Sequence, residues 1–469
     1  VCDFIETDLR GNIFEDLTLY NLCNPYTIIG DLIVANGATL TIEPGVQIEF
    51  EGPYSITVID GAKLMSLGSE QDSITISGIS WNGIDIKTPG SMIQYTRIIE
   101  EANSSQGDYL LKLTRSHIDK SHIYGGTRGI QLNDSSIVSR SKIHDIRNEA
   151  IQLYQRSVAY GNTLYDIGTD MNYDAAVQTY DRSYFLNNKV YSTLDDPNTI
   201  AVAAQSSGVI AGNTIGSDKG IHGKFGIYVR EGGQVEVVGN RIGGFNTNVV
   251  LIGTRPEFKD NTFMGELDSE AKQMNVRVAS QMLSAENQSY PNYLDNYDYY
   301  GWDYGVDRQV VDMQENYWSN VESNDIASSI YDYDDRADLI GNIDFSNELI
   351  IPSSDAPISP PKNVIKLSHP NGVEFKWTPN EEADLKGYKV YYGRQNNGTF
   401  TNTMEIGSGS SYVLVGGNVN NTYYLTAYDT DADGVDDQVE GHESWFADPA
   451  ASIEVSVSTD NNNISELTQ

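Results

Sequence analysis

The sequence has 469 residues, enough for two or more domains, and a formal net charge of -36 at pH 7. A surface this acidic repels nucleic acid and anionic membranes, so we expect neither as a partner. No apolar run approaches the roughly 20 residues that a membrane-spanning helix needs, so we expect no transmembrane segment.

Residues 1–30 contain no repeat and are predicted to form an N-terminal cap. The only cysteines of the chain, Cys2 and Cys23, both lie in this segment. A local disulfide between them would staple the cap in an oxidising compartment. Lipid attachment at Cys2 and a pair of free thiols are the alternatives.

A short phrase recurs between residues 121 and 263: a Ser or Asn, one further residue, and then an apolar side chain. Its occurrences follow one another at similar but unequal intervals, which is typical of a solenoid whose coils differ by loop insertions. The phrase occurs at Ser121–Ile123, Ser141–Ile143, Asn162–Leu164, Asn188–Val190, Asn213–Ile215, Asn240–Ile242 and Asn261–Phe263. Alternating apolar patches such as Gly129–Leu132 and Gly226–Val229 predict strands with one buried face.

Helical repeats of similar length would need runs of about ten or more residues with apolar side chains three and four apart. Asn, Gly, Ser and Asp interrupt every run before that length. The Asn of the phrase tolerates a left-handed turn and can stack its amide on the Asn of the next coil. We therefore predict an all-β chain in which residues 31–350 form a right-handed parallel β-helix, the hand being the usual one for parallel crossovers.

The segment Asp31–Phe50 alternates inward and outward side chains and is expected to form the first full coil. Together with Ile74–Ser77 and Trp81–Ile84, it resembles the opening coils of secreted bacterial β-helix repeat proteins. The resemblance continues in Glu315–Trp318 and Ile330–Asp335, which in that family close the last coil, and extends the solenoid to about residue 349. Because this architecture serves lyases, glycosidases, esterases and adhesins, it does not identify a function.

Residues 351–361 are rich in proline and predict an extended linker. In residues 362–457, alternating segments around Trp377, Tyr388 and Tyr423 predict a small β-sandwich. The phrase Trp377–Tyr392 resembles a fibronectin type III module of bacterial secreted enzymes and surface proteins, in which the Trp fills the core. Residues 458–469, rich in Asn and Ser, are predicted to be a flexible tail.

Within this module, the segment Asp429–Glu440 has acidic residues at positions 1, 3, 5, 9 and 12 and a glycine at position 6. This is the oxygen-ligand spacing of a calcium loop, since neighbouring carboxylates repel one another unless a cation neutralises them. The predicted ligands of a stabilising calcium ion are Asp429, Asp431, Asp433, Asp437 and Glu440. A solvated acidic loop is the alternative.

Catalytic residues of a solenoid must recur at about the length of one coil if neighbouring coils are to present them together. Asp170, Asp196 and His222 follow one another at equal intervals of this length, and Arg255 follows. The short sequence motifs around these residues loosely resemble the signature of polygalacturonase-type glycosidases, and this resemblance implies two carboxylates that act as acid and base. The motifs that contain Asp170 and Arg255 depart from that signature, and the residue before His222 is not Gly. Polar residues on a solvated coil are therefore the competing interpretation.

A polysaccharide lyase instead needs cations that neutralise a uronate and a base that removes its α-proton. Arg156 and Arg182 are separated by the same interval as Asp170 and Asp196, and Arg230 lies in a basic cluster with His222. Such residues also commonly balance neighbouring acids. The catalytic candidates are therefore Asp170, Asp196, His222 and Arg230.

Aromatic side chains form two groups in the sequence, one of which contains Tyr173 and Tyr180 and the other Tyr299 and Trp302. Such rings can stack on sugars while their polar ends stay wet, and they can equally form the small core of an insertion. Because their intervals are irregular, we expect no regular ladder of stacked rings. The candidate substrate-binding residues are Arg156, Arg182, Tyr173, Tyr180, Tyr299 and Trp302.

We therefore expect a secreted or cell-surface protein that binds an extracellular polysaccharide or cell-surface glycan. Whether it also cleaves the glycan, as a polysaccharide lyase or a glycoside hydrolase, is left open by the sequence. The alternative is a non-catalytic structural or adhesive protein whose β-helix is a rigid stalk and whose partners are surface or matrix proteins.

Overall fold

The computed structural model describes residues 7–101, 109–168, 175–191, 200–216, 223–229, 235–252, 256–264, 274–279, 309–319, 323–335, 341–395, 399–447 and 450–452. The chain divides into two compact units. The first comprises Val1–Pro357 and Val439–Gly441, and the second comprises Ile358–Gln438 and His442–Gln469. In the part of the chain that is described, no helix is long and apolar enough to cross a membrane.

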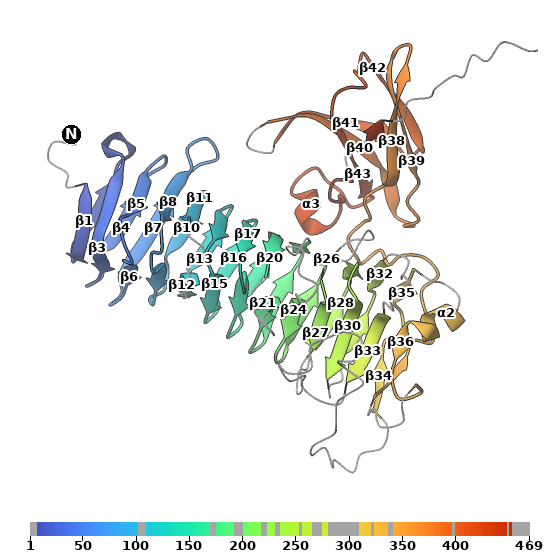
Figure 1. Ribbon diagram of the computed structural model, residues 1–469, viewed down its shortest axis with the longest axis horizontal. Helices are drawn as coiled ribbons and strands as arrows, with labels where there is room; N and C mark the ends of the chain where they lie inside the picture. Colours follow the sequence, from blue (N-terminus) through green and yellow to red (C-terminus); the bar gives the residue numbers. More distant parts are fainter. Residues whose placement is uncertain are drawn as a thin grey trace, which may run out of the picture. The chain divides into compact units, whose positions relative to one another are not determined.

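The first unit is a parallel β-solenoid in which each coil contributes a strand to each of three faces (Figure 1). Strands of the first face pair in register with the equivalent strand of the next coil. The strands of the first face are β5 (Gln47–Phe50), β8 (Ile74–Gly78), β11 (Thr96–Glu100), β14 (His122–Gly125), β17 (Lys142–Ile146), β20 (Thr163–Ile167), β23 (Lys189–Val190), β26 (Thr214–Gly216), β29 (Arg241–Gly243), β32 (Thr262–Met264) and β35 (Tyr317–Trp318).

The second and third faces follow the first along each coil. The strands of the second face are β6 (Ile56–Val58), β9 (Ile84–Ile86), β12 (Tyr109–Thr114), β15 (Arg128–Asn133), β18 (Ile151–Leu153), β21 (Ala175–Thr179), β24 (Ile200–Ala204), β27 (Phe225–Val229), β30 (Thr247–Ile252), β33 (Met274–Ala279) and β36 (Ile330–Tyr331). The strands of the third face are β2 (Leu17–Leu19), β4 (Thr39–Ile42), β7 (Lys63–Leu67), β10 (Met92–Gln94), β13 (His117–Asp119), β16 (Ile137–Ser139), β19 (Val158–Tyr160), β22 (Ser183–Leu186), β25 (Gly208–Ala211), β28 (Val235–Val238) and β31 (Glu257–Lys259).

Both ends of the solenoid have less regular elements. At the N-terminal end, β1 (Asp8–Ile13) pairs with β3 (Tyr26–Val34), and β3 joins the first and second faces because it pairs with both β5 and β6. A short 3-10 helix (Asn21–Cys23) precedes β3. At the C-terminal end lie α2 (Ser323–Ser328) and the pair formed by β34 (Gln309–Asp312) and β37 (Gly341–Asp344).

The apolar residue of the recurring phrase points into the solenoid in every coil. Ile123, Ile143 and Leu164 pair in register on the first face and are fully buried. The column ends at Phe263 and Trp318, whose rings stack with centroids 4.4 Å apart. One repeat of the phrase therefore corresponds to one coil, and the predicted parallel solenoid is confirmed.

The Asn of the phrase forms a buried ladder along the inside of the coils. Each amide nitrogen donates to the side-chain oxygen of the next Asn, over 2.9 Å from Asn162 to Asn188 and 3.1 Å from Asn188 to Asn213. The same oxygens accept backbone N–H groups, as Asn213 does from Asn188 over 2.8 Å. The predicted amide stacking is confirmed, and the complete ladder runs through Asn162, Asn188, Asn213, Asn240, Asn261 and Asn316.

The left-handed turn, however, lies one residue earlier than the sequence analysis placed it. Arg140 (φ 46°), Asn187 (φ 53°) and Gly212 (φ 64°) each precede the first residue of a phrase, and none of the ladder asparagines has a positive φ. The turn at the preceding residue directs the following side chain inward, where it can bond to the coils on both sides. The assignment of the left-handed conformation to the phrase Asn was therefore wrong.

The second unit is a β-sandwich of two small sheets. One sheet contains β42 (Ser411–Val415), β39 (Gly372–Thr378), β38 (Lys362–His369) and β44 (Ala451–Ser452), and the other contains β41 (Phe400–Gly407), β40 (Leu385–Arg394) and β43 (Tyr423–Asp429). Side chains from both sheets share one core, in which the predicted Trp377 is buried against Tyr388 with ring centroids 5.0 Å apart. The helix α3 (Asp437–Glu440) follows β43.

The predicted segment boundaries differ in detail from those of the structure. Leu17–Leu19, inside the predicted cap, already pairs in the third face, because a three-residue strand is too short to be recognised by its pattern. The predicted linker 351–361 spans the division between the units at Pro357 and Ile358. Its residues are packed, since Ser353 N–H donates to Thr262 in the first unit and Ile358 belongs to the core of the second.

Candidate functional site

The outward side chains of the first face form two parallel rows, because strand residues alternate between the interior and the surface. One row runs in register through Arg97, His122, Lys142, Thr163 and Lys189, and this part of it is here called the donor row; it continues on the following coils with Thr214 and Arg241. The second row, two residues further along each strand, is here called the aromatic row and consists of Tyr124, His144, Tyr165 and Tyr191. Arg97 and Lys142 are exposed, and the other members of the donor row are half-buried.

The rings of the aromatic row stack on one another from coil to coil. Ring centroids lie 5.0 Å apart between Tyr124 and His144, 4.5 Å between His144 and Tyr165, and 5.5 Å between Tyr165 and Tyr191. The interplanar angles of 5°, 12° and 23° are those of stacked rings. The expectation that irregular intervals exclude a regular ladder was wrong, because loops between the strands absorb the differences in coil length.

Two histidines link the donor row to the aromatic row. The Nε2 atoms of His122 and His144 are hydrogen-bonded to one another, and His144 Nδ1 lies 2.6 Å from a carboxylate oxygen of Asp145. Arg97 also bridges the rows, since its guanidinium donates to the hydroxyl of Tyr124 over 3.1 Å. Burial, followed by the positive charges of His144, Lys142 and Arg97, lowers the pKa of His122 to about 4, so this imidazole is neutral at pH 7.

The last member of the donor row, Lys189, sits in a partly desolvated position. Burial lowers the pKa of its ammonium group to about 7. Its Nζ atom lies 4.5 Å from the centroid of the Tyr191 ring, a distance at which a cation is attracted to the ring face. An anion that binds beside Lys189 would stabilise the protonated, positively charged form of this side chain and would in turn be attracted to it.

The second face carries a polar network whose groups are bonded to one another. The oxygen of the Gln152 amide accepts from the Tyr109 hydroxyl over 2.7 Å and from Gln131 over 2.9 Å. The hydroxyl of Tyr180 donates to the Gln178 oxygen over 2.7 Å. Gln152 and Gln178 are only 8% and 5% exposed, so these two amides are largely inaccessible to a ligand.

Tyr180, a predicted substrate-binding residue, belongs to this second face. Its ring stacks on Tyr154 with centroids 4.6 Å apart and an angle of 14°, so one ring face is already covered. Burial, followed by the neighbouring Tyr180, raises the pKa of Tyr154 to about 12.

The predicted cations Arg156 and Arg182 occupy equivalent turns of adjacent coils, between the second and third faces. Both residues are exposed and have left-handed backbones, with φ values of 64° and 60°. The backbone N–H of Arg156 donates to the carbonyl of Asp181 over 3.1 Å, and that of Arg182 to the carbonyl of Ser207 over 2.7 Å. Their spacing in the sequence therefore identified a real alignment of two cations, although not on the face that carries the donor row.

The remaining predicted site residues of the solenoid lie outside the described residues. These are Asp170, Asp196, His222, Arg230, Tyr173, Tyr299 and Trp302. The first three belong to chain connections that lead from the first face to the second in three consecutive coils. Cys23 is buried and disulfide-bonded, and the one other cysteine of the sequence, Cys2, is likewise outside the described residues.

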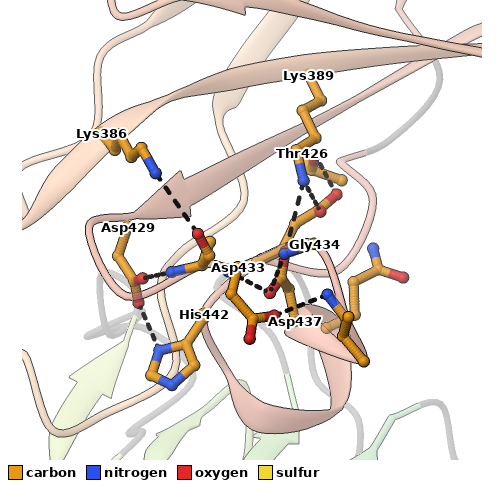
Figure 2. A network of polar contacts seen from close by, with 12 residues as sticks. Lys386, Lys389, Thr426, Asp429, Asp433, Gly434, Asp437 and His442 are labelled. Atoms are coloured by element: carbon orange, nitrogen blue, oxygen red, sulfur yellow. Dashed lines mark hydrogen bonds and ion pairs between the residues drawn. The ribbon is translucent and has the colours of Figure 1, made fainter.

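The acidic loop that follows β43 is held by backbone and side-chain donors (Figure 2). Asp429 accepts the N–H groups of Asp431 and Ala432 over 2.9 and 3.0 Å and faces His442 Nδ1 at 3.0 Å. Asp437 accepts the N–H group of Asp433 over 2.9 Å. These two carboxylates are buried, whereas those of Asp431, Asp433 and Glu440 are exposed.

A buried cluster of charged side chains contacts this loop. Glu443, only 4% exposed, accepts hydrogen bonds from Lys389 over 2.6 Å, Tyr391 over 2.5 Å and Thr426 over 2.7 Å. Lys389 Nζ also lies 3.6 Å from Asp437. Although burial lowers the pKa of Lys389, the hydrogen bond and charge of Glu443 outweigh it, and the net direction is upward.

The loop geometry bears on the predicted calcium ligands. Within the described ranges, no three His, Cys, Asp or Glu side chains converge as a metal site. Burial, together with the negative charges of Asp429 and Asp431, raises the pKa of Asp384, which faces the loop from the turn before β40. The loop thus concentrates negative charge that a cation would relieve.

The outward residues that the sequence did not lead us to group together are those of the donor and aromatic rows. Their signal is present, because all of them except Arg97 stand one or three residues after Ser121, Ser141, Asn162 or Asn188. Aligning the repeats on the phrase would have placed His122 beside Lys142, and Tyr124 beside His144 and Tyr165.

No protein-family model and no curated protein matches the sequence. Among solved structures, the chain is similar to a tailspike protein of the Escherichia coli bacteriophage HK620 in complex with a hexasaccharide, with 11% identity, a TM-score of 0.31, and coverage of 90% of this chain and 74% of the tailspike. It is also similar to a double mutant of the periplasmic alginate epimerase AlgG, with 11% identity, a TM-score of 0.25, and coverage of 74% and 79%. Similarity at this level says nothing about the side chains of the two rows.

Proposed function

We propose that the protein binds an extended polysaccharide along the first face of its solenoid, in a secreted or cell-surface setting. The observation that carries this proposal is the pair of parallel rows, one of hydrogen-bond donors and one of aromatic edges. The rows repeat with every coil, about 4.8 Å apart. A polymer of sugar rings is the ligand that repeats on a similar scale and uses both donors and apolar edges.

Accessibility favours the first face over the second. Arg97 and Lys142 are exposed, whereas Gln152 and Gln178 of the second face are buried and bonded to neighbouring side chains. Since the rings of the aromatic row cover each other's faces, they would contact a sugar with their edges and hydroxyl groups. Hydrogen bonds from the donor row would then supply most of the specificity.

A glycan panel tests this proposal. The protein would be titrated with acidic and neutral polysaccharides in the presence of calcium, with binding measured by calorimetry. The variant Thr163→Leu, which removes a hydroxyl and adds bulk in the middle of the donor row, should weaken binding by about tenfold. Thr41→Leu on the third face is the matched control, and equal loss in both variants would contradict the assignment to the first face.

Cleavage of the bound glycan is a separate question that the same samples answer. New reducing ends would identify a glycan-cleaving enzyme, and absorbance from unsaturated uronate products would separate a lyase from a hydrolase. Asp170, Asp196, His222 and Arg230 stay the candidates for this chemistry. Their alanine variants should lose cleavage and keep binding if they act as acid, base or charge-neutralising groups.

The second candidate function is a rigid stalk that displays an adhesive surface. The interior Asn ladder and the stacked aromatic row favour it, because both stiffen successive coils against one another. No binding to any glycan, combined with saturable binding to surface or matrix proteins, would select this alternative.

For the second unit, we propose a fibronectin type III module that is stabilised by calcium at Asp429–Glu440. The tyrosine corner supports the module type, since the Tyr423 hydroxyl donates to the carbonyl of Asn418 over 3.0 Å and accepts its N–H over 3.1 Å. The charge concentration around Asp384 supports the cation. Calcium should raise the melting temperature of this unit and chelator should lower it; an unchanged melting temperature and metal content would contradict calcium binding.

A further inference from the structure

The donor row is basic in a chain that is strongly acidic. The sequence has 66 acidic residues against 30 lysines and arginines. In contrast, the row runs Arg97, His122, Lys142, Thr163, Lys189 along five consecutive coils and contains no carboxylate. This concentration of one charge requires an explanation.

The two exposed cations of the row form no ion pair with a described residue, although the negative charge of Asp145 acts on His122 between them. Among the described residues, no ion pair joins Arg97 or Lys142 to a carboxylate, and the bond that Arg97 makes is to the neutral Tyr124 hydroxyl. The carboxylate of Asp145 is used by His144. Elsewhere on the solenoid some exposed cations are paired, as Arg115 is with Asp134 over 2.5 Å and Lys259 is with Glu315 over 3.1 Å, whereas Arg156 and Arg182 form no ion pair with a described residue.

Like charges aligned across parallel strands cost stability unless a counter-charge relieves them. The effect is visible at His122, where the positive charges of Lys142 and Arg97 act with burial to lower the pKa of the imidazole. A ligand that places an anion beside each cation of the row, that is, over every second coil, would relieve this repulsion.

We propose that the ligand of the first face is an anionic polysaccharide, with a carboxylate or sulfate on its sugar residues that lies against Arg97, Lys142 and Lys189. This inference rests on the proposed function and specifies its substrate class. The neutral side chains of His122 and Thr163 alternate with the cations and can bond to sugar hydroxyl groups. The charged groups thus bind the anionic groups of the polymer, and the neutral groups between them form hydrogen bonds with its hydroxyl groups.

Charge density distinguishes this ligand from nucleic acid. Double-stranded DNA carries one negative charge per about 1.7 Å of its axis, so the net charge of -36 repels it strongly. A glycan with at most one acid per sugar carries far less charge per unit length. Because the Debye length is about 8 Å at physiological salt, such a polymer feels mainly the row that it touches.

The experiment compares binding of polygalacturonate, alginate, neutral dextran and duplex DNA to the full chain. The test variant is Arg97→Gln with Lys142→Gln. The matched control is Lys63→Gln with Lys87→Gln, which makes the same change in net charge on coils of the solenoid but outside the donor row. Circular dichroism and thermal melting confirm that both variants fold.

The expected result is that an acidic glycan binds and DNA does not, and that the test variant weakens acidic-glycan binding by about tenfold to a hundredfold. The control variant should change it by less than about twofold. The pair Arg97→Lys with Lys142→Arg should restore most of the affinity, because the charges remain.

The other outcomes overturn the inference in distinguishable ways. Binding of dextran alone, unaffected by the test variant, refutes the anionic substrate and leaves the proposed function standing. Equal binding of DNA, or equal loss in test and control variants, would mean general attraction between polyions only. Failure to bind any polysaccharide would remove the proposed function together with this inference.

Discussion

Removing one amide from the inner ladder should destabilise the solenoid severely, and Asn213→Ala is the cleanest change. The side-chain oxygen of Asn213 accepts from Asn188 N over 2.8 Å and from Asn188 Nδ2 over 3.1 Å. Its amide nitrogen donates to Phe185 O over 2.8 Å, Ala211 O over 3.0 Å and Asn240 Oδ1 over 2.9 Å. The residue is fully buried, so water cannot replace these bonds.

The expected loss follows from which groups keep a partner. The Asn188 amide nitrogen retains Ala159 O and Leu186 O, and Asn240 Oδ1 retains the Asn213 N–H. The backbone N–H of Asn188 loses its acceptor, at a cost of about 1–3 kcal/mol. With roughly 1 kcal/mol for each of the weakened bonds, we expect a total of about 3–5 kcal/mol.

Urea unfolding followed by circular dichroism measures this loss, and hydrogen exchange of the Asn188 amide locates it. Because neighbouring coils interact mainly with each other, exchange should accelerate around Asn188 and Asn240 and stay unchanged in the second unit. Thr214→Ala, a half-buried outward position at the next residue, is the control. A loss below about 1 kcal/mol with unchanged exchange at Asn188 would refute the account of the ladder.

Three further perturbations probe other parts of the molecule. Glu443→Ala should destabilise the second unit by about 3–5 kcal/mol in calorimetry, because the buried Lys389 ammonium would keep only its more distant partner, Asp437. A change in stability no larger than that of a surface control variant would count against this prediction. The pKa of His122 is about 4 in the folded protein and about 6.5 in the unfolded chain, so the stability that comes from this group is complete above pH 6.5 and is lost as the pH falls from 6.5 to 4. Discounted for the partial exposure of the ring, the loss is about 1–2 kcal/mol. The variant His122→Gln should therefore flatten the pH profile of urea unfolding. Gly125→Ala should lower the free energy of unfolding by more than about 2 kcal/mol in the same assay, because φ is 81° and the added carbon would clash with the carbonyl oxygen of Glu100. A tolerated substitution would mean that the turn can rearrange.

The fold could be predicted from the sequence because the interior repeats strictly. Each coil must place an apolar side chain such as Ile143 and a ladder side chain such as Asn162 at fixed points, so these residues recur in the sequence. The alternating residues Val373, Phe375 and Trp377 likewise identified a buried strand face in the second unit. Among the described residues, the short strands near the N-terminus, the packing of the predicted linker and the position of the left-handed turn escaped prediction.

The candidate site was harder to predict because spacing along the sequence counts loop residues as well as strand residues. A search for one fixed interval identified Arg156 and Arg182 correctly as neighbours, since both belong to equivalent turns. It gave no information about the shorter intervals that separate Tyr124, His144 and Tyr165. Register relative to the ladder, and not raw spacing, determines which outward side chains meet.

The contrast between the two sides of the same strands bears on function. Inward positions of the first face are fixed by packing and by the ladder, so their side chains follow from the fold alone. Outward positions are free of that constraint, and a solvated coil of this acidic chain would tolerate any polar residue there. That Arg97, Lys142 and Lys189 nevertheless align along one row, beside rings that stack in register, is therefore not required by folding. It costs electrostatic repulsion, and a ligand of opposite charge that spans several coils is the simplest physical reason for retaining it.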